Sequence, residues 1–176
     1  MPPEEHKAAY RSIIEAVNAG DFDAMDALFA ANMVDHNPVP GQVPGLAGFK
    51  QWMATARRSF PDLRGTVGHV LAEGELVAGR VTWRGTQAGP FVGAAPTGQS
   101  VAFEAYHIAR FEGRKVAEWW GTADIFGALA HLGALTGPVK SYGVVLAGWM
   151  RPRLLKARAG CRRSLASLGS LAARFL

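Results

Sequence analysis

The chain has 176 residues, of which 49% are hydrophobic and 19% are charged. This composition suits one globular domain with its own core and makes two full domains unlikely in so short a chain. The single cysteine, Cys161, excludes an internal disulfide and a cysteine-rich metal site, as is usual in a reducing compartment.

The net charge of +5 is concentrated near the C-terminus. Residues 137–176 contain eight of the nineteen Lys and Arg residues and no Asp or Glu, so the rest of the chain has an acidic excess. That balance excludes a nucleic-acid-binding function for the main part of the chain. We therefore predict a globular domain over 1–136 and a basic C-terminal extension over 137–176, flexible or partly helical. A helical extension could contact an anionic membrane surface or an acidic partner weakly.

The N-terminus lacks the basic and then apolar order of a secretory signal. No apolar run approaches the roughly 18 residues that a membrane-spanning helix needs. These features predict a cytoplasmic protein.

Helical patterns dominate the first sixty residues. Apolar residues at helical spacing predict a helix over 4–18, which Gly20 ends. A second helix is predicted over 22–31, with Asp21 as its N-cap, and a third over 46–59. Between the last two lies a short extended segment, 33–38, followed by a loop rich in Pro and Gly.

From Leu63 onward the hydrophobic pattern alternates with a period of two. The alternating runs predict four strands, over 63–73, 75–86, 99–111 and 115–124. Gly74 and Gly113 lie at the tight turns of antiparallel hairpins, and a last helix is predicted over 125–132. This order predicts an α+β fold in which helices pack on one face of a curved antiparallel sheet, enclosing a cone with an open mouth.

Asp124 is the first candidate for catalysis, because it follows Trp119-Trp120 and precedes Ile125-Phe126. Few polar neighbours in sequence would stabilise its charge, and burial there would raise its pKa and make it a better general base. The alternative is a structural role, since Asp before an apolar helix is a common N-cap. The two roles are compatible.

His107 is the second candidate. The alternation of its strand places it on the same face as Phe103, Ala105 and Ala109, where a polar ring needs a hydrogen-bond partner. That partner could be another core residue or, inside a cone, a substrate oxygen. His36 could face the mouth of the cavity, whereas Asp35 beside it is interpreted as turn chemistry.

Motifs for other chemistry are absent from the sequence. The histidines are scattered without the spacing of metal ligands, and the Gly-rich segment 85–98 lacks the patterns that bind nucleotides. There is no GxSxG motif for a nucleophilic serine. We expect no metal and no cofactor.

Several short motifs in order resemble the SnoaL-like polyketide cyclases, also called the ester cyclase family, of the nuclear-transport-factor-2-like superfamily. The resemblance covers about residues 5–133. Its motifs are Asp35-His36, Phe60-Pro61-Asp62-Leu63, Gly85-Thr86, Gly89-Pro90-Phe91-Val92-Gly93, Pro96-Thr97-Gly98, Glu118-Trp119-Trp120-Gly121-Thr122-Ala123-Asp124 and His131-Leu132-Gly133.

The resemblance implies a cone-shaped α+β fold, a homo-oligomer, and a cavity for a flat, hydrophobic polycyclic molecule. It implies that Asp124 is the general acid/base of a cofactor-independent intramolecular aldol ring closure in a polyketide-type ester. His107 would then orient the substrate's oxygens. His36 and the aromatic residues Trp52, Phe91 and Trp120 are expected to bind the substrate.

The chain departs from the family pattern at Trp119, where a His is expected before Trp-Gly. Proteins of this fold also isomerise steroids, hydrolyse epoxides or bind ligands without chemistry. The alternative function is therefore a non-catalytic protein that binds a small molecule, and an Asp124 that only caps its helix would favour it.

Overall fold

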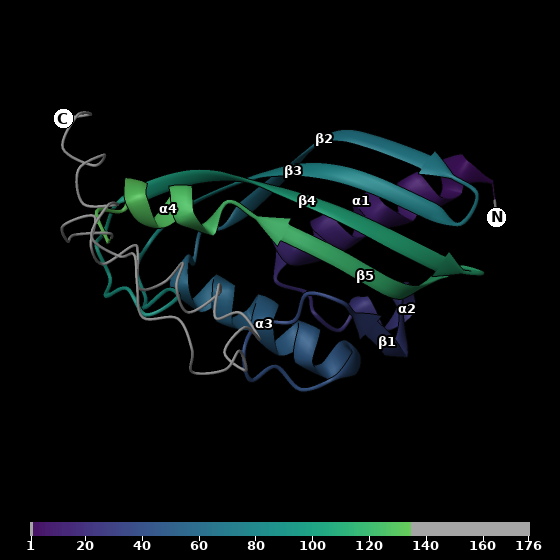
Figure 1. The fold of residues 1–176 in the computed structure, drawn as a ribbon, viewed down its shortest axis with the longest axis horizontal. Coiled ribbons are helices and arrows are strands. Elements are labelled where there is room, and N and C mark those ends of the chain that lie inside the picture. Colours follow the sequence, from purple (N-terminus) through teal and green to yellow (C-terminus); the bar gives the residue numbers. More distant parts are fainter. Residues whose placement is uncertain (1, 135–176) are drawn as a thin grey trace, which may run out of the picture. The chain divides into compact units, whose positions relative to one another are not determined.

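The computed structural model describes residues 2–134, which form helices and one sheet (Figure 1). The basic extension predicted over 137–176 lies outside the described residues. The elements are α1 (Pro3–Ala19), α2 (Met25–Leu28), β1 (Phe29–Asp35), α3 (Gly45–Ser59), β2 (Arg64–Glu73), β3 (Leu76–Thr86), β4 (Ser100–Glu112), β5 (Lys115–Ala123) and α4 (Ile125–His131).

The predicted α+β architecture is confirmed, with one correction to the sheet. The five strands have the order β1-β5-β4-β3-β2, and β2 to β5 pair as antiparallel neighbours. However, β1 pairs parallel to β5, so the sheet is mixed rather than purely antiparallel. The fifth strand comes from the segment before α3, far from β5 in sequence, and local alternation does not reveal such a pairing.

The second predicted helix, over 22–31, is wrong in extent. Helix α2 covers only Met25–Leu28, and Phe29 already begins strand β1. The side chains of Phe29 and Met33 are buried in the core, and the backbone of the strand pairs with β5. Tertiary pairing therefore overrides the helical spacing of the apolar residues in this segment.

The extended segment predicted over 33–38 is displaced as well, because β1 covers Phe29–Asp35. The other boundaries agree with the predictions to within one or two residues. The backbone of Gly20 has φ of 71° and caps α1 in the left-handed conformation. Gly74 and Gly113, with φ of 56° and 60°, make the two tight hairpin turns. Asp21 accepts a hydrogen bond from the N–H of Ala24, one residue before α2 begins.

The helices cover the inner face of the sheet, and a continuous hydrophobic core lies between them. Its largest fully buried side chains include Tyr10 and Ile13 of α1, Phe29 of β1 and Phe111 of β4. No helix in the described region is long and apolar enough to cross a membrane.

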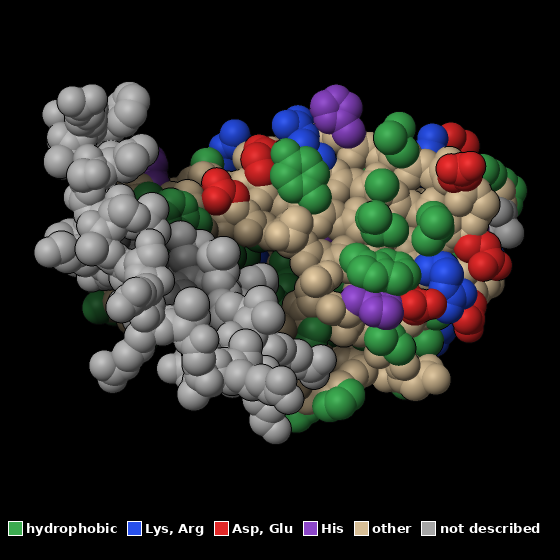
Figure 2. Space-filling view, viewed as in Figure 1, with side chains coloured by type: hydrophobic (Ala, Val, Ile, Leu, Met, Phe, Trp, Pro, Cys, Tyr) green, Lys and Arg blue, Asp and Glu red, His purple; other side chains and the backbone are tan. Residues whose placement is uncertain are grey.

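The outer face of the sheet carries charged side chains among separate apolar patches (Figure 2). The Nε atom of Arg110 lies 2.6 Å from a carboxylate oxygen of Glu118, and Arg80 lies 3.6 Å from Glu104. Glu104 and Glu118 are therefore paired with cations on the outer face of the sheet.

Candidate functional site

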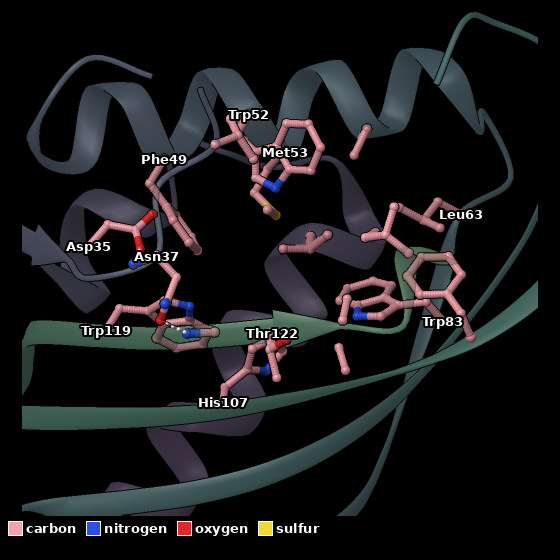
Figure 3. Close-up of a pocket in the computed structure, with 18 of the residues that line it drawn as sticks. Asp35, Asn37, Phe49, Trp52, Met53, Leu63, Trp83, His107, Trp119 and Thr122 are labelled. Carbon is pink, nitrogen blue, oxygen red and sulfur yellow. Dashed lines mark hydrogen bonds between the residues drawn. The ribbon is translucent and has the colours of Figure 1, made fainter. Parts of the chain in front are cut away.

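A cavity of about 310 Å³ lies between the inner face of the sheet, α1 and α3 (Figure 3). Its volume is at the small end of the range for small-molecule sites. Apolar side chains form most of its lining: Ile13, Ile14, Val17, Val39, Phe49, Trp52, Met53, Ala56, Phe60, Leu63, Trp83, Phe91, Phe103, Ala105, Trp119, Ala123 and Ile125.

Polar groups are few and unevenly placed along this cavity. The polar side chains in the lining are Asp35, Asn37, Gln42, His107 and Thr122. In the close-up, Asp35 and Asn37 lie near Trp119 at one end, whereas Leu63 and Trp83 lie at the other (Figure 3). A ligand with one oxygen-rich end and one apolar end would match this distribution.

The polar end is built by the last residue of β1, Asp35, and by the segment that follows it. The two carboxylate oxygens of Asp35 accept hydrogen bonds from the backbone N–H of Asn37 at 3.0 Å and from the side-chain amide of Gln42 at 2.9 Å. The amide oxygen of Asn37 accepts from the backbone N–H of Gly121 on β5 at 3.2 Å. Asp35 therefore has the turn contact expected from the sequence, and it also lines the cavity.

His107 lies on the inner face of β4, as the alternation predicted. Its side chain lines the cavity together with Phe103 and Ala105. Its Nδ1 atom is 2.8 Å from the hydroxyl of Tyr10, and its ring centroid is 4.7 Å from that of Trp119. Burial lowers the pKa of His107 to about 4, so the ring is neutral near pH 7.

Two of the aromatic residues expected to bind substrate, Trp52 and Phe91, line the cavity. Trp52 comes from α3. Phe91 comes from the long loop between β3 and β4, where its backbone pairs with Ala94 and its buried ring packs edge-on against Phe60 at 4.9 Å. The loop thus contributes a wall of the cavity.

Trp120 and His36 do not lie in this cavity, and their predicted position is wrong. In the pairing of β4 with β5, Trp119 is opposite Ala109 and Gly121 is opposite His107, so Trp120 belongs to the outer face. The His36 ring stacks on Trp120 with centroids 4.3 Å apart and planes 1° from parallel. The cavity wall is therefore Trp119.

The same outer cluster includes Glu118. Its carboxylate lies 2.7 Å from Nε2 of His36, and it also accepts a hydrogen bond from Arg110. The hydrogen bond with His36, and then that with Arg110, lowers the pKa of Glu118 below its ordinary value. His36, Glu118 and Arg110 therefore form a hydrogen-bonded cluster on the outer face, outside the cavity.

Asp124 has the geometry of the N-cap alternative, and its side chain does not lie in a desolvated environment. Its side chain is exposed, and one carboxylate oxygen accepts a hydrogen bond from the backbone N–H of Gly127 at 2.8 Å. Its neighbours Ala123 and Ile125 line the cavity, but Asp124 is not among the lining residues. Asp124 is therefore adjacent in sequence to two lining residues, but its carboxylate does not line the cavity.

Tyr10, Gln42 and Trp119 are parts of the site that were not predicted from the sequence. Tyr10 is three residues before Ile13 on the first helix, so helical spacing marks it as a core residue but gives no sign of His107 as its partner. Within residues 2–134, no group of three or more His, Cys, Asp or Glu side chains is arranged to hold a metal ion.

Comparisons with known proteins find a matching family profile and similar folds. The family profile described as SnoaL-like polyketide cyclase matches residues 7–132. No curated protein matches the chain. Among solved structures, TsrD from Streptomyces laurentii is 24% identical with a TM-score of 0.72, and the match covers 77% of this chain and 99% of TsrD.

Two further Streptomyces structures are similar at higher identity. AclR from Streptomyces galilaeus, a candidate hydroxylase, is 30% identical with a TM-score of 0.67, and the match covers 76% of this chain and 99% of AclR. IdmH from Streptomyces antibioticus, a candidate polyketide cyclase, is 29% identical with a TM-score of 0.66, with 73% and 98% covered.

Proposed function

Because the chain belongs to the SnoaL-like polyketide cyclase family, we propose that it is a cofactor-independent cyclase that closes a ring in a polyketide-type ester. A base removes the acidic C–H proton beside the ester, and the resulting carbanion attacks a carbonyl carbon of the same molecule. A C–C bond forms, and the carbonyl oxygen takes up a proton to become a hydroxyl. The protein needs to supply a base, a donor for that oxygen and a folded substrate conformation.

The observation that supports this proposal is the one-ended polarity of the cavity. Aromatic walls that include Trp52 and Phe91 suit a flat, hydrophobic polycyclic body, and the polar groups near Trp119 suit its oxygens. His107 is neutral near pH 7 and lies in the lining, so it can hydrogen-bond a carbonyl without adding a buried charge.

In this proposal Asp35 is the general base. Among the described residues it is the one acidic side chain that lines the cavity. Its hydrogen bonds with Asn37 and Gln42 fix the orientation of the carboxylate, as positioned acid/base catalysis requires. Asp124, the base implied by the family resemblance, is the competing assignment, and its cap geometry is the argument against it.

Two matched variants decide between these carboxylates. The natural ligand is first identified by mass spectrometry of small molecules that copurify with the full chain, and turnover of that compound is then measured. We expect Asp35→Asn to lower kcat by about 10²- to 10⁴-fold, the usual contribution of general acid/base catalysis, and Asp124→Asn to retain turnover. Loss of turnover in Asp124→Asn together with retained turnover in Asp35→Asn would instead identify Asp124 as the base.

A second candidate function is ligand binding without chemistry. The exposed, capping Asp124 favours it, as does Trp119 in place of the expected His. Under this function the wild-type chain would release the copurified compound unchanged after prolonged incubation, and Asp35→Asn would alter its affinity at most.

A further inference from the structure

His107 lies in a row of three residues that crosses the sheet, with glycine on both sides. In the antiparallel pairings of β4, His107 is opposite Gly79 of β3 and opposite Gly121 of β5. Glycine inside a strand weakens it and often marks a place where another group approaches the backbone closely. Here two such positions flank one imidazole.

Aromatic rings occupy the space that these glycines leave open. A Cβ atom at Gly79 would lie 2.3 Å from Cζ of Tyr10, and one at Gly121 would lie 2.9 Å from Nε1 of Trp119. The rings of Tyr10 and Trp119 are stacked, with centroids 6.1 Å apart and planes 13° from parallel. The absence of side chains at both glycines therefore allows Tyr10 and Trp119 to pack beside His107.

The hydrogen bond between Tyr10 and His107 has one consistent direction. The Tyr10 side chain is fully buried, and the contact with Nδ1 of His107 is the one hydrogen bond that its hydroxyl makes among the described residues. A buried O–H has to donate, and a neutral imidazole has one acceptor nitrogen. Burial also raises the pKa of Tyr10, so the hydroxyl keeps its proton.

The proton of the neutral His107 ring then belongs on Nε2. Nδ1 already accepts the hydrogen bond from Tyr10, so the other ring nitrogen, Nε2, carries the hydrogen of the neutral ring. Within the described residues Nε2 makes no hydrogen bond, so it is available to a ligand. A ring with this tautomer donates to a carbonyl or enolate oxygen and cannot accept a proton at Nε2.

We infer that Tyr10 is a positioning residue that fixes His107 as the Nε2–H tautomer and thereby makes it a hydrogen-bond donor toward an oxygen of the bound ligand. The conclusion that this donor acts in catalysis rests on the proposed function. The tautomer itself does not, because it follows from contacts within the protein.

The first test is spectroscopic and needs no ligand. Histidine labelled with ¹⁵N in the full chain gives long-range ¹H–¹⁵N NMR correlations that distinguish a protonated from an unprotonated ring nitrogen. We expect protonated Nε2 and unprotonated Nδ1 for His107 in the wild type at pH 7, and a shift toward protonated Nδ1 in Tyr10→Phe. An Nδ1–H tautomer in the wild type would overturn the inference even if the variant failed to fold.

The control variant is Tyr106→Phe, which also removes a hydroxyl. Tyr106 precedes His107 on the same strand, but the residue is exposed, with a relative accessibility of 52%. We expect its substitution to leave the His107 spectrum unchanged. Equal spectra for wild type and a folded Tyr10→Phe would also contradict the inference.

The second test uses two probes of similar shape, the methyl ester of anthraquinone-2-carboxylic acid and that of anthracene-2-carboxylic acid, which lacks the ring carbonyls. Loss of the fixed donor in Tyr10→Phe should weaken the quinone about three- to tenfold and leave the anthracene nearly unaffected. Equal weakening of both probes would assign Tyr10 a packing role only. If neither probe binds the wild type, the proposed ligand class fails while the NMR result stands.

Discussion

The carboxylate of Asp124 and the backbone N–H of Gly127 form a hydrogen bond of 2.8 Å that caps the first turn of α4. Substitution by alanine removes this acceptor, and we expect Asp124→Ala to lower the free energy of unfolding by about 1 kcal/mol. Asparagine caps helices as well as aspartate does, so Asp124→Asn should stay near wild type. Urea unfolding checks both variants, and equal losses in the two would show that the charge matters more than the cap.

Gly79 is predicted to be intolerant of a side chain. A Cβ atom there would overlap the buried Tyr10 ring, and overpacking of this kind costs about 1–3 kcal/mol. Gly68→Ala is the matched control, since its Cβ would meet only the end of the flexible Arg80 side chain, at 3.0 Å. Thermal unfolding should separate the two variants clearly, and a Gly79→Ala protein as stable as Gly68→Ala would disprove the close approach.

Stability is predicted to fall as the pH drops from about 6.5 to about 4. The pKa of His107 is lowered from its ordinary 6.5 to about 4, so in this window the unfolded chain binds a proton that the folded chain does not. The unfolded state is thereby favoured, by up to about 3 kcal/mol at pH 4, and the full stability returns above pH 6.5. Urea titrations at pH 7, 5.5 and 4.5 measure the loss.

His107→Gln isolates this contribution, because glutamine can still accept a hydrogen bond from Tyr10 but does not titrate. The variant should lose less stability than the wild type over the same pH window. Identical pH profiles would mean that other groups cause the acid sensitivity.

Trp52 of α3 and Trp120 of β5 lie on different sides of the sheet, and we expect their removal to affect ligand affinity differently. Trp52 lines the cavity, and removal of its ring in Trp52→Ala should weaken binding of the anthraquinone ester by about tenfold, the equivalent of 1–2 kcal/mol of apolar contact. Trp120→Ala removes a ring from the outer face and should leave the affinity unchanged. Isothermal titration calorimetry compares them, and a larger effect at Trp120 would place the ligand elsewhere.

Local patterns in the sequence were sufficient for most of the fold. Alternation and turn glycines located β2 to β5, because each hairpin is short-range and each strand has one buried face. The pattern indicated an extended segment only over 33–38 and not the whole strand Phe29–Asp35, since its partner β5 lies more than eighty residues later. Pairing with β5, and not local propensity, decides the conformation of that segment.

The site was harder to predict because it depends on register and on long-range contacts. Trp119 and Trp120 are chemically identical neighbours, and the irregular register of β4 against β5 near Arg110 adds to the difficulty of assigning their faces from alternation. His107 was placed correctly because its own strand alternates regularly. Its partner Tyr10 lies 97 residues away, and no spacing rule connects a helix residue with a strand residue at that distance.

The lining of the cavity has an optical consequence. Trp52, Trp83 and Trp119 all border the space where a ligand would lie. A conjugated polycyclic compound absorbs where tryptophan emits, so its entry would quench these indoles by energy transfer over such short distances. Substitution by Phe of the other two tryptophans in the sequence, Trp120 and Trp149, would leave these three cavity tryptophans as the indole chromophores. The intrinsic fluorescence of the chain would then report occupancy of the cavity directly, without a label, while candidate compounds are screened.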